Sequence, residues 1–204
     1  CLAIADASEL PLEVYHHIRM PTPFAIETGI VAARDGVTPV RVRMLNSDNL
    51  CELLVETPGK RVNYDGAAKI DGVPGTSAPI VCNYLDVAGS ATGSLLPTGN
   101  VLDVVDGVEV TCVDNGMPVV VVAASEFGVS GYESCEDLEG NASLRGRLES
   151  LRIAAGTAMG LGDVTEKTVP KMTLVAPPVS GGTVCTRTFI PHRCHDAIGV
   201  LGAV

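Results

Sequence analysis

Apolar residues that alternate with polar ones predict a chain built mainly from β-strands. Val40, Val42 and Met44 alternate with two arginines, which is typical of a strand with one buried face. Other short apolar runs end at clusters of Gly, Pro, Asn or Asp, which favour turns. These runs predict strands over residues 51–56, 61–64, 80–85, 108–113, 118–123, 171–176 and 183–190.

Helical spacing of apolar residues predicts helices in three places: much of residues 1–33, residues 138–162 and residues 196–204. The middle one has the clearest pattern, with a stripe of Leu144, Leu148, Leu151 and Ala155. Its charged residues, Arg145, Arg147, Glu149 and Arg152, fall mostly on other faces. Few helices among many strands indicate the α+β class with mostly antiparallel sheets.

Two segments rich in Gly, Pro, Ser and Thr, residues 70–80 and 89–99, are expected to be irregular loops. Neither carries the Gly-Lys-Ser/Thr ending of a phosphate-binding loop, so nucleotide binding is not expected. A second unit is expected to begin close to Val101.

Composition restricts the class of partner. The chain has 204 residues, enough for one large or two small domains, and a formal net charge of −10. This charge argues against nucleic acid and anionic membranes as partners, so an anionic substrate needs a local positive site. No apolar run approaches the roughly 20 residues of a spanning helix. The seven cysteines are scattered without a Cys-x-x-Cys pair, which suits a reducing cytoplasm.

The most informative segment for chemistry is residues 192–195, His-Arg-Cys-His, between the last predicted strand and the last predicted helix. If the helix begins at Asp196, the four side chains cluster at its positive end, where N–H groups favour anions and lower a thiol pKa. Cys194 and His195 are then candidate acid–base groups, with His192 and Arg193 as carboxylate ligands. The alternatives are a buried helix with polar residues at its mouth, a small buried residue at Cys194, surface positions for His192 and Arg193, and a zinc site.

Asn115 and Lys171 are further candidates for binding or catalysis. Asn115 follows Asp114 in a turn whose Gly116 lets a ligand approach the backbone, although an ordinary Asp-Asn-Gly turn explains the same residues. Lys171 opens a strand, where it could clamp a carboxylate, act as a base if burial lowers its pKa, or lie in solvent. Gly75 and Thr76 could offer backbone and hydroxyl donors, or simply shape their loop.

Seven ordered segments resemble the methylaconitate isomerase and 4-oxalomesaconate tautomerase family, whose members are relatives of diaminopimelate epimerase. They are residues 23–27, 70–76, 95–99, 106–118, 159–163, 169–172 and 191–195. The resemblance runs from about residue 21 to the end, and its Asn-Gly-Met-Pro and His-Arg-Cys-His forms look closer to the tautomerases. Residues 1–22 look unlike the family, and the family's Ser-Lys loops and first catalytic cysteine are absent. Both ends look cut, so we expect an incomplete chain that self-associates, as a homo-oligomer or less specifically.

The resemblance implies a fold, a reaction and a site. It implies two incomplete epimerase-like domains, residues 1–102 and 103–204, each a sheet wrapped round a central helix, with substrate in the cleft between them. It implies a 1,3-proton shift in an unsaturated tricarboxylate, as in bacterial breakdown of gallate-like aromatics, without a redox cofactor or metal. The implied catalytic residues are Cys194, His195 and Lys171; the implied binding residues are Asn115, Asp114, His192, Arg193, Gly75 and Thr76. Aconitate-type double-bond isomerisation and an inactive polycarboxylate binder remain alternatives.

Overall fold

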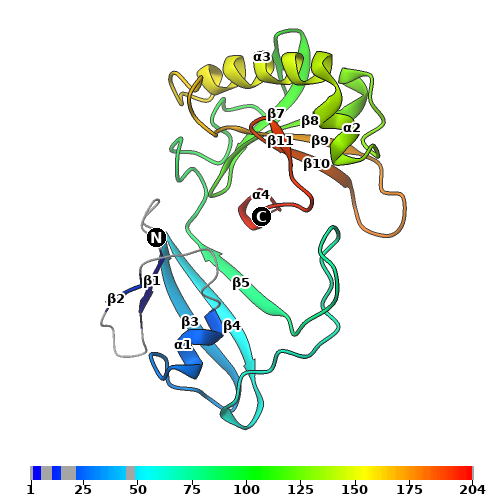
Figure 1. Cartoon of the computed structure of the whole chain (residues 1–204). Coiled ribbons are helices and arrows are strands. Elements are labelled where there is room, and N and C mark those ends of the chain that lie inside the picture. Colours follow the sequence, from blue (N-terminus) through cyan, green and yellow to red (C-terminus); the bar gives the residue numbers. More distant parts are fainter. Residues whose placement is uncertain (1, 6–10, 15–21, 45–48, 204) are drawn as a thin grey trace. The chain divides into compact units, whose positions relative to one another are not determined.

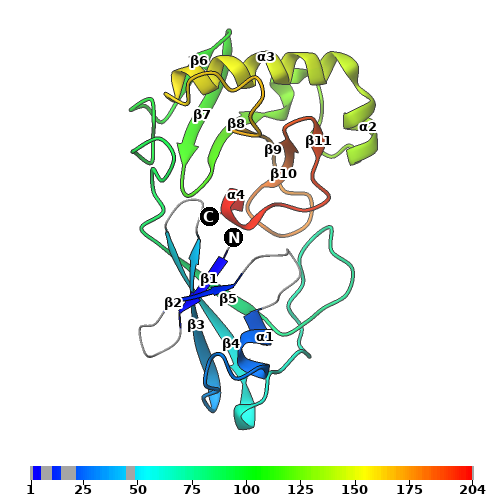
Figure 2. The same ribbon diagram turned by 60° about the vertical axis from the view of Figure 1, so that its left-hand side comes forward.

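The chain folds into two compact units. The computed structural model describes residues 2–5, 11–14, 22–44 and 49–203. Unit 1 is Cys1–Val87 and unit 2 is Ala88–Val204, and each is built on its own sheet (Figures 1 and 2). The division falls before the expected boundary at residues 102/103, because the loop that follows Val87 bonds to a strand of unit 2. The assignment of the two parts to epimerase-like domains stays a prediction.

Unit 1 is a five-stranded antiparallel sheet in the order β2-β1-β3-β4-β5. Its elements are β1 (Leu2–Ala5), β2 (Pro11–Val14), α1 (Thr22–Glu27), β3 (Gly36–Met44), β4 (Leu50–Thr57), the 3₁₀ turn η1 (Pro58–Lys60) and β5 (Ile80–Leu85). Ala25 and Ile26 of α1 share a buried cluster with Val40 and Val55 of the sheet. The small size of this cluster gives unit 1 a modest core.

Unit 2 is a six-stranded sheet in the order β11-β10-β9-β8-β7-β6. Every neighbouring pair is antiparallel except β8 and β9, which run parallel. Its elements are β6 (Asp103–Val105), β7 (Val108–Asp114), β8 (Pro118–Ala123), the 3₁₀ turn η2 (Ala124–Phe127), α2 (Cys135–Gly140), α3 (Ala142–Ala158), β9 (Lys171–Ala176), β10 (Cys185–Ile190), β11 (Arg193–Cys194) and α4 (Val200–Ala203). The parallel pair requires a long crossover, and α2 and α3 supply it.

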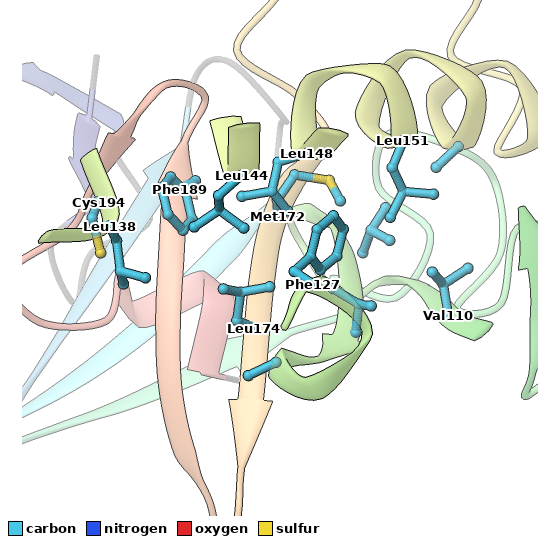
Figure 3. Close-up of a cluster of buried hydrophobic side chains, with 14 of the residues drawn as sticks. Val110, Phe127, Leu138, Leu144, Leu148, Leu151, Met172, Leu174, Phe189 and Cys194 are labelled. Carbon is cyan, nitrogen blue, oxygen red and sulfur yellow. The ribbon is translucent and has the colours of Figure 1, made fainter. Parts of the chain in front are cut away.

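The core of unit 2 lies between α3 and one face of its sheet (Figure 3). The leucine stripe of α3, Leu144, Leu148 and Leu151, is buried there as its spacing predicts. Met172, Leu174 and Phe189 meet it from β9 and β10. Each fully buried side chain of this size contributes about 1.5–3 kcal/mol to stability. We call this covered side of the sheet the inner face and the opposite side the outer face.

The α+β class and most of the strands are confirmed, but the helical prediction for residues 1–33 is wrong where the structure describes them. Leu2–Ala5 pairs with both β2 and β3, and only Thr22–Glu27 is helical. Pairing with two neighbouring strands outweighs local helical spacing, and Pro21 and Pro23 restrict any longer helix. The remaining residues of that segment up to 21 lie outside the described residues.

The strand expected over residues 61–64 is also absent from the described structure. The position beside β4 is taken by β5, which pairs with it from Val55 to Leu50. Asn63 instead makes local bonds, from its backbone to Glu56 and from its side chain to Glu56 and Asp65. The loop expected at residues 70–80 is irregular up to Pro79, and β5 begins at Ile80. The loop expected at residues 89–99 is irregular throughout.

The helix expected over residues 138–162 is two helices that end earlier. Asn141 interrupts it: it terminates α2, and its side-chain oxygen accepts a hydrogen bond from Leu144 N at 3.0 Å as the cap of α3. Gly160, with φ of +74°, follows the last helical turn. The strand expected from residue 183 begins at Cys185.

The C-terminal helix expected over residues 196–204 is wrong in its start. The chain forms β11 at Arg193–Cys194, and the α4 turn begins only at Val200. The backbone N–H of His195 bonds to Thr188 O at 2.8 Å, and that of Ala197 bonds to the imidazole of His195 at 3.0 Å. These bonds place residues 193–197 against the sheet instead of in a helix. Among the described residues, no helix has the length and apolar character needed to span a membrane.

The packing of α3 predicts a large loss of stability when a leucine of its stripe is truncated. We expect Leu151→Ala to lower the free energy of unfolding by about 2–5 kcal/mol, because the cavity cannot close. Ile153→Ala, on the exposed side of the same helix, is the matched control and should cost less than about 1 kcal/mol. Urea unfolding followed by circular dichroism measures both, and equal losses would contradict the assigned core.

Candidate functional site

One edge of the unit 2 sheet collects the ends of its central strands. The antiparallel and parallel registers place Asp114 beside Pro118, Val119 beside Lys171, and Phe189 beside Met172. The turn at Asn115, the start of β9 and the β10–β11 turn therefore lie along the same edge. Three segments predicted to carry chemistry, far apart in sequence, are brought together in this way.

Lys171 and His195 belong to the outer face at this edge. Met172 lies in the core under α3, so strand alternation places Lys171 on the opposite side. Likewise Cys194 lies in that core, so the next residue, His195, belongs to the outer face. The backbone of His195 bonds that of Thr188, and the hydroxyl of Thr188 bonds that of Thr173 at 3.0 Å. The outer face thus carries an amine, an imidazole and two hydroxyls.

Lys171 has the electrostatic setting of a functional amine. Its side chain is half-buried, and within the described residues its amine makes no hydrogen bond or ion pair. Burial lowers the pKa of Lys171 from its ordinary value, and the nearby positive charge of Arg152 lowers it further. A lysine acts as a base only in its neutral form, and a lowered pKa reduces the free energy needed to reach that form.

His195 is held in one orientation by its own backbone. Its Nδ1 accepts the Ala197 N–H at 3.0 Å, so the neutral imidazole carries its proton on Nε2. The ring is partly exposed. It can therefore present an N–H donor to a ligand at the outer face.

Cys194 does not have the environment expected of it. It lies in β11 on the inner side, where its Sγ and that of Cys135 both approach the carbonyl oxygen of His195, at 3.9 and 3.5 Å. Burial raises the pKa of Cys194 to about 12; the neighbouring Cys135 adds to the rise, and the positive charge of Arg187 offsets only part of it. The expected lowering of its pKa is wrong, because burial is the largest influence on the thiol and the helix expected to begin at Asp196 begins only at Val200.

His192 and Arg193 contact acidic side chains of the helices. His192 Nδ1 lies 3.7 Å from Glu149 of α3, and Arg193 Nε lies 3.9 Å from Glu139 of α2. Both side chains are well exposed. These contacts favour the surface alternative for the pair.

Asp114 holds the loop of residues 88–95 at this edge of the sheet. Its Oδ2 accepts hydrogen bonds from Ala91 N, Thr92 N and Thr92 Oγ1, at 2.8, 2.8 and 2.9 Å. Its backbone bonds Gly89 and Leu95, and Ala88 forms a bridge with Asn115. Asp114 is fully buried, and its Oδ1 has no partner within the described residues. The loop of residues 88–95 is therefore fixed beside the partly exposed Asn115.

Gly75 and Thr76 lie in unit 1, apart in sequence and in unit from the other candidates. Both are exposed in the irregular loop, and Gly75 has a φ of +83° that favours glycine. The nearest regular contact is the bridge between Ala68 and Ser77, which closes the loop.

Sequence reasoning missed the role of Arg152, which was placed among the charged residues that fall mostly outside the leucine stripe of the helix. Its side chain is fully buried, and it forms two hydrogen bonds of 2.7 Å with Glu149. The signal available in the sequence was the Glu149–Arg152 spacing of three, which places both on one helical face. Nothing in the pattern indicated that this face is covered by the segment before β9.

No metal centre forms from the candidate residues. His192 faces Glu149 while Cys194 faces Cys135, so the proposed zinc ligands do not converge. More generally, no group of three or more His, Cys, Asp or Glu within the described ranges is arranged to hold a metal ion.

The comparison with known proteins agrees with this architecture. The family model described as PrpF protein matches residues 20–204. The chain belongs to the PrpF family. It is 56% identical to the (4E)-oxalomesaconate Delta-isomerase of Novosphingobium sp. (strain KA1), over 89% of its own length and 51% of the relative's. The 4-oxalomesaconate tautomerase of Pseudomonas putida (strain KT2440) is 54% identical over 89% of this chain and 50% of the relative.

A solved structure has the same fold. The crystal structure of methylitaconate-delta-isomerase superposes with a TM-score of 0.72 and 30% identity, covering 88% of this chain and 52% of that one. The chain thus spans about half the length of the PrpF relatives that it matches.

The raised pKa of Cys194 predicts a slow reaction with alkylating reagents. At pH 8 we expect iodoacetamide to modify native Cys194 about 100-fold or more slowly than the same residue in the urea-unfolded chain, since only the thiolate reacts. Peptide mass spectrometry follows the time course, and the unfolded chain is the internal control. Comparable rates in both states would show that the thiol is accessible and ionised.

The contacts of Asp114 predict a specific effect on the loop of residues 88–95. In Asp114→Asn we expect backbone amides of Ala91 and Thr92 to exchange with solvent about 10-fold faster, because one acceptor of three hydrogen bonds is weakened. Hydrogen exchange measured by NMR reports each amide. Asp163→Asn, in an exposed turn, is the control and should leave both amides unchanged.

Proposed function

We propose that this PrpF chain belongs to an isomerase that moves a proton across three atoms of an unsaturated tricarboxylate of the 4-oxalomesaconate type. One observation carries the proposal: the identity to oxalomesaconate isomerases is well above that to methylitaconate isomerase. The substrate is a small molecule, and neither nucleic acid nor a membrane is part of the proposal. The expected cytoplasmic location stays a prediction.

The finer fold is part of the proposal. We assign the chain to the diaminopimelate epimerase-like fold, with residues 1–102 in the first domain and 103–204 in the second. The packing of helices on one face of each sheet supports this assignment. Gly75 and Thr76 stay candidate substrate-binding residues of unit 1, since their loop is exposed and Gly75 has a φ of +83°.

The reaction needs a base, an acid and a site for developing charge. The base takes a proton from the carbon next to a carbonyl group, and the electron pair of that C–H bond forms an enolate. A proton is then delivered to the enolate oxygen, or to the carbon two atoms away. Positive and N–H groups near the oxygen lower the energy of the enolate. The reaction moves only protons and an electron pair within the substrate, so it involves no net change of oxidation state.

Lys171 and His195 are the residues of this chain that we assign to proton transfer. The lowered pKa of Lys171 supports a role as base, and its positive form could instead bind a carboxylate. His195 has a directed Nε2 donor for the enolate or a carboxylate. Asn115, on the fixed turn at the same edge, is assigned to substrate binding, with Asp114 supporting it.

Cys194 has a weaker basis as an acid–base group. With a pKa raised to about 12, its thiol stays protonated at neutral pH, so it cannot serve as a base in this state. It can serve as a proton donor only if substrate changes its surroundings. His192 and Arg193 are available to attract an anion toward the edge from the surface.

Double-bond isomerisation of a methylaconitate or methylitaconate type is the second candidate. The structural likeness to methylitaconate isomerase supports it, and the same proton shift serves both reactions. A catalytically inactive chain that binds polycarboxylates is the third candidate, since the raised pKa of Cys194, about 12, keeps its thiol protonated at neutral pH.

The two roles of Lys171 predict opposite effects of pH. If its amine is the base, kcat with oxalomesaconate rises as pH increases through the lowered pKa, because the neutral amine accumulates. If its ammonium group binds a carboxylate, KM rises over the same range and kcat does not. The enol absorbance measures turnover, and thermal shift measures binding.

Lys171→Met should lower kcat/KM for oxalomesaconate at least about 100-fold. Lys69→Met, in an exposed loop of unit 1, is the matched control and should retain the wild-type rate. Stabilisation by substrate without turnover would favour the binder, and equal rates in both variants would remove Lys171 from the mechanism.

A further inference from the structure

The buried guanidinium of Arg152 uses all of its hydrogen-bonding capacity. Nε and one N–H of Nη2 bind the two carboxylate oxygens of Glu149, each at 2.7 Å. Nη1 donates to the carbonyl oxygens of Lys167 and Val169, at 3.1 and 3.0 Å, and Nη2 also reaches that of Thr165 at 3.5 Å. Five N–H groups thus have five acceptors, which a charge with no exposed surface requires.

These carbonyl groups belong to the segment that leads into β9. Val169 lies two residues before Lys171, and the bonds to residues 165, 167 and 169 follow this segment at every second residue. The segment has no strand partner of its own within the described residues. Arg152 therefore supplies the hydrogen bonds that set where β9 starts.

Glu149 extends the same network to the neighbouring turn. Its Oε2 accepts from Arg152 and also lies 3.7 Å from Nδ1 of His192, at the β10–β11 turn. Hydrogen bonds and charge from Arg152, followed by the charge of His192, lower the pKa of Glu149. One carboxylate thus connects α3 to two of the segments that form the edge.

We propose that Arg152, oriented by Glu149, is a positioning residue for the isomerase: it fixes the segment before Lys171 and holds a permanent positive charge behind that amine. The inference rests on the proposed function and adds to it a residue that touches no substrate. Arg152 acts through Lys171 in two ways, by geometry and by charge.

The charge effect follows from burial. A positive group near an ammonium disfavours its protonated form, and little water screens Arg152. Arg152 is the charged group that acts on Lys171 among the described residues, and burial of Lys171 acts in the same direction. Glu149 moderates this effect, since its negative charge pairs with the guanidinium.

The test is the titration of Lys171 in the full chain, which needs no turnover. Reductive methylation with ¹³C-formaldehyde labels the lysines, and Lys171→Arg identifies the NMR signal of Lys171. Arg152→Met should raise the pKa of Lys171 by about 0.5 unit or more, whereas Glu149→Gln should lower it. Arg152→Lys keeps the charge and should leave the pKa nearer to the wild-type value. An unchanged pKa in both Arg152→Met and Glu149→Gln would overturn the proposal.

A purely structural residue would not produce opposite shifts in these variants. If Arg152→Met does not fold, Glu149→Gln and Arg152→Lys still decide the question, because both retain a positive charge. In Arg152→Lys, amide exchange of residues 166–169 and 171 should be about 10-fold faster, since the three N–H donors of a lysine cannot serve all five acceptors of Arg152. Unchanged exchange would refute the geometric part. If neither the wild-type chain nor any variant isomerises oxalomesaconate, the proposed function is contradicted. The titration of Lys171 still tests the effect of Arg152 in that case, because it does not depend on turnover.

Discussion

The packing of α3 against one face of the unit 2 sheet is the constraint on which the site depends. The leucine stripe and alternating apolar residues of β7 to β10 fill most of the inner face. Residues of opposite parity, including Lys171 and Thr188, are directed to the outer face. The division between a packed face and a chemical face follows from strand alternation once the helix is in place.

Two buried charged side chains support the edge where these residues gather. Asp114 accepts hydrogen bonds from main-chain N–H groups of one loop, and Arg152 donates to main-chain carbonyl groups of another. Asp114 is the last residue of β7, and Arg152 lies within α3. Neither needs to contact a ligand to influence the site, because Asp114 fixes the position of the turn at Asn115 and Arg152 fixes the start of β9. Such support from behind is typical of sites that must be rigid before a ligand arrives.

Sequence reasoning succeeded where the pattern is local and failed where tertiary contacts decide. The strand at Lys171–Ala176 and the leucine stripe of α3 depend on short-range periodicity, and both were predictable. The segment at residues 192–197 was not, because its hydrogen bonds go to Thr188 and to an imidazole instead of a helix.

The candidate residues show the same division. Their types and rough location could be predicted from the resemblance and from turn chemistry. The raised pKa of Cys194 could not, because it is caused by burial and then by Cys135, which approaches from a helix far away in sequence. Arg152 was missed for a related reason: its burial comes from a loop whose path no periodicity reveals.

The single parallel strand pair has a consequence for how unit 2 acquires its structure. Val119 and Lys171 can meet only after the chain between them has returned across the sheet, through α2 and α3. Such distant pairing costs loop entropy before it gains hydrogen bonds, so β9 cannot join β8 ahead of the helical crossover. We therefore expect the edge that carries Asn115, Lys171 and His195 to assemble after the hairpins between neighbouring strands, because it needs contacts far apart in sequence.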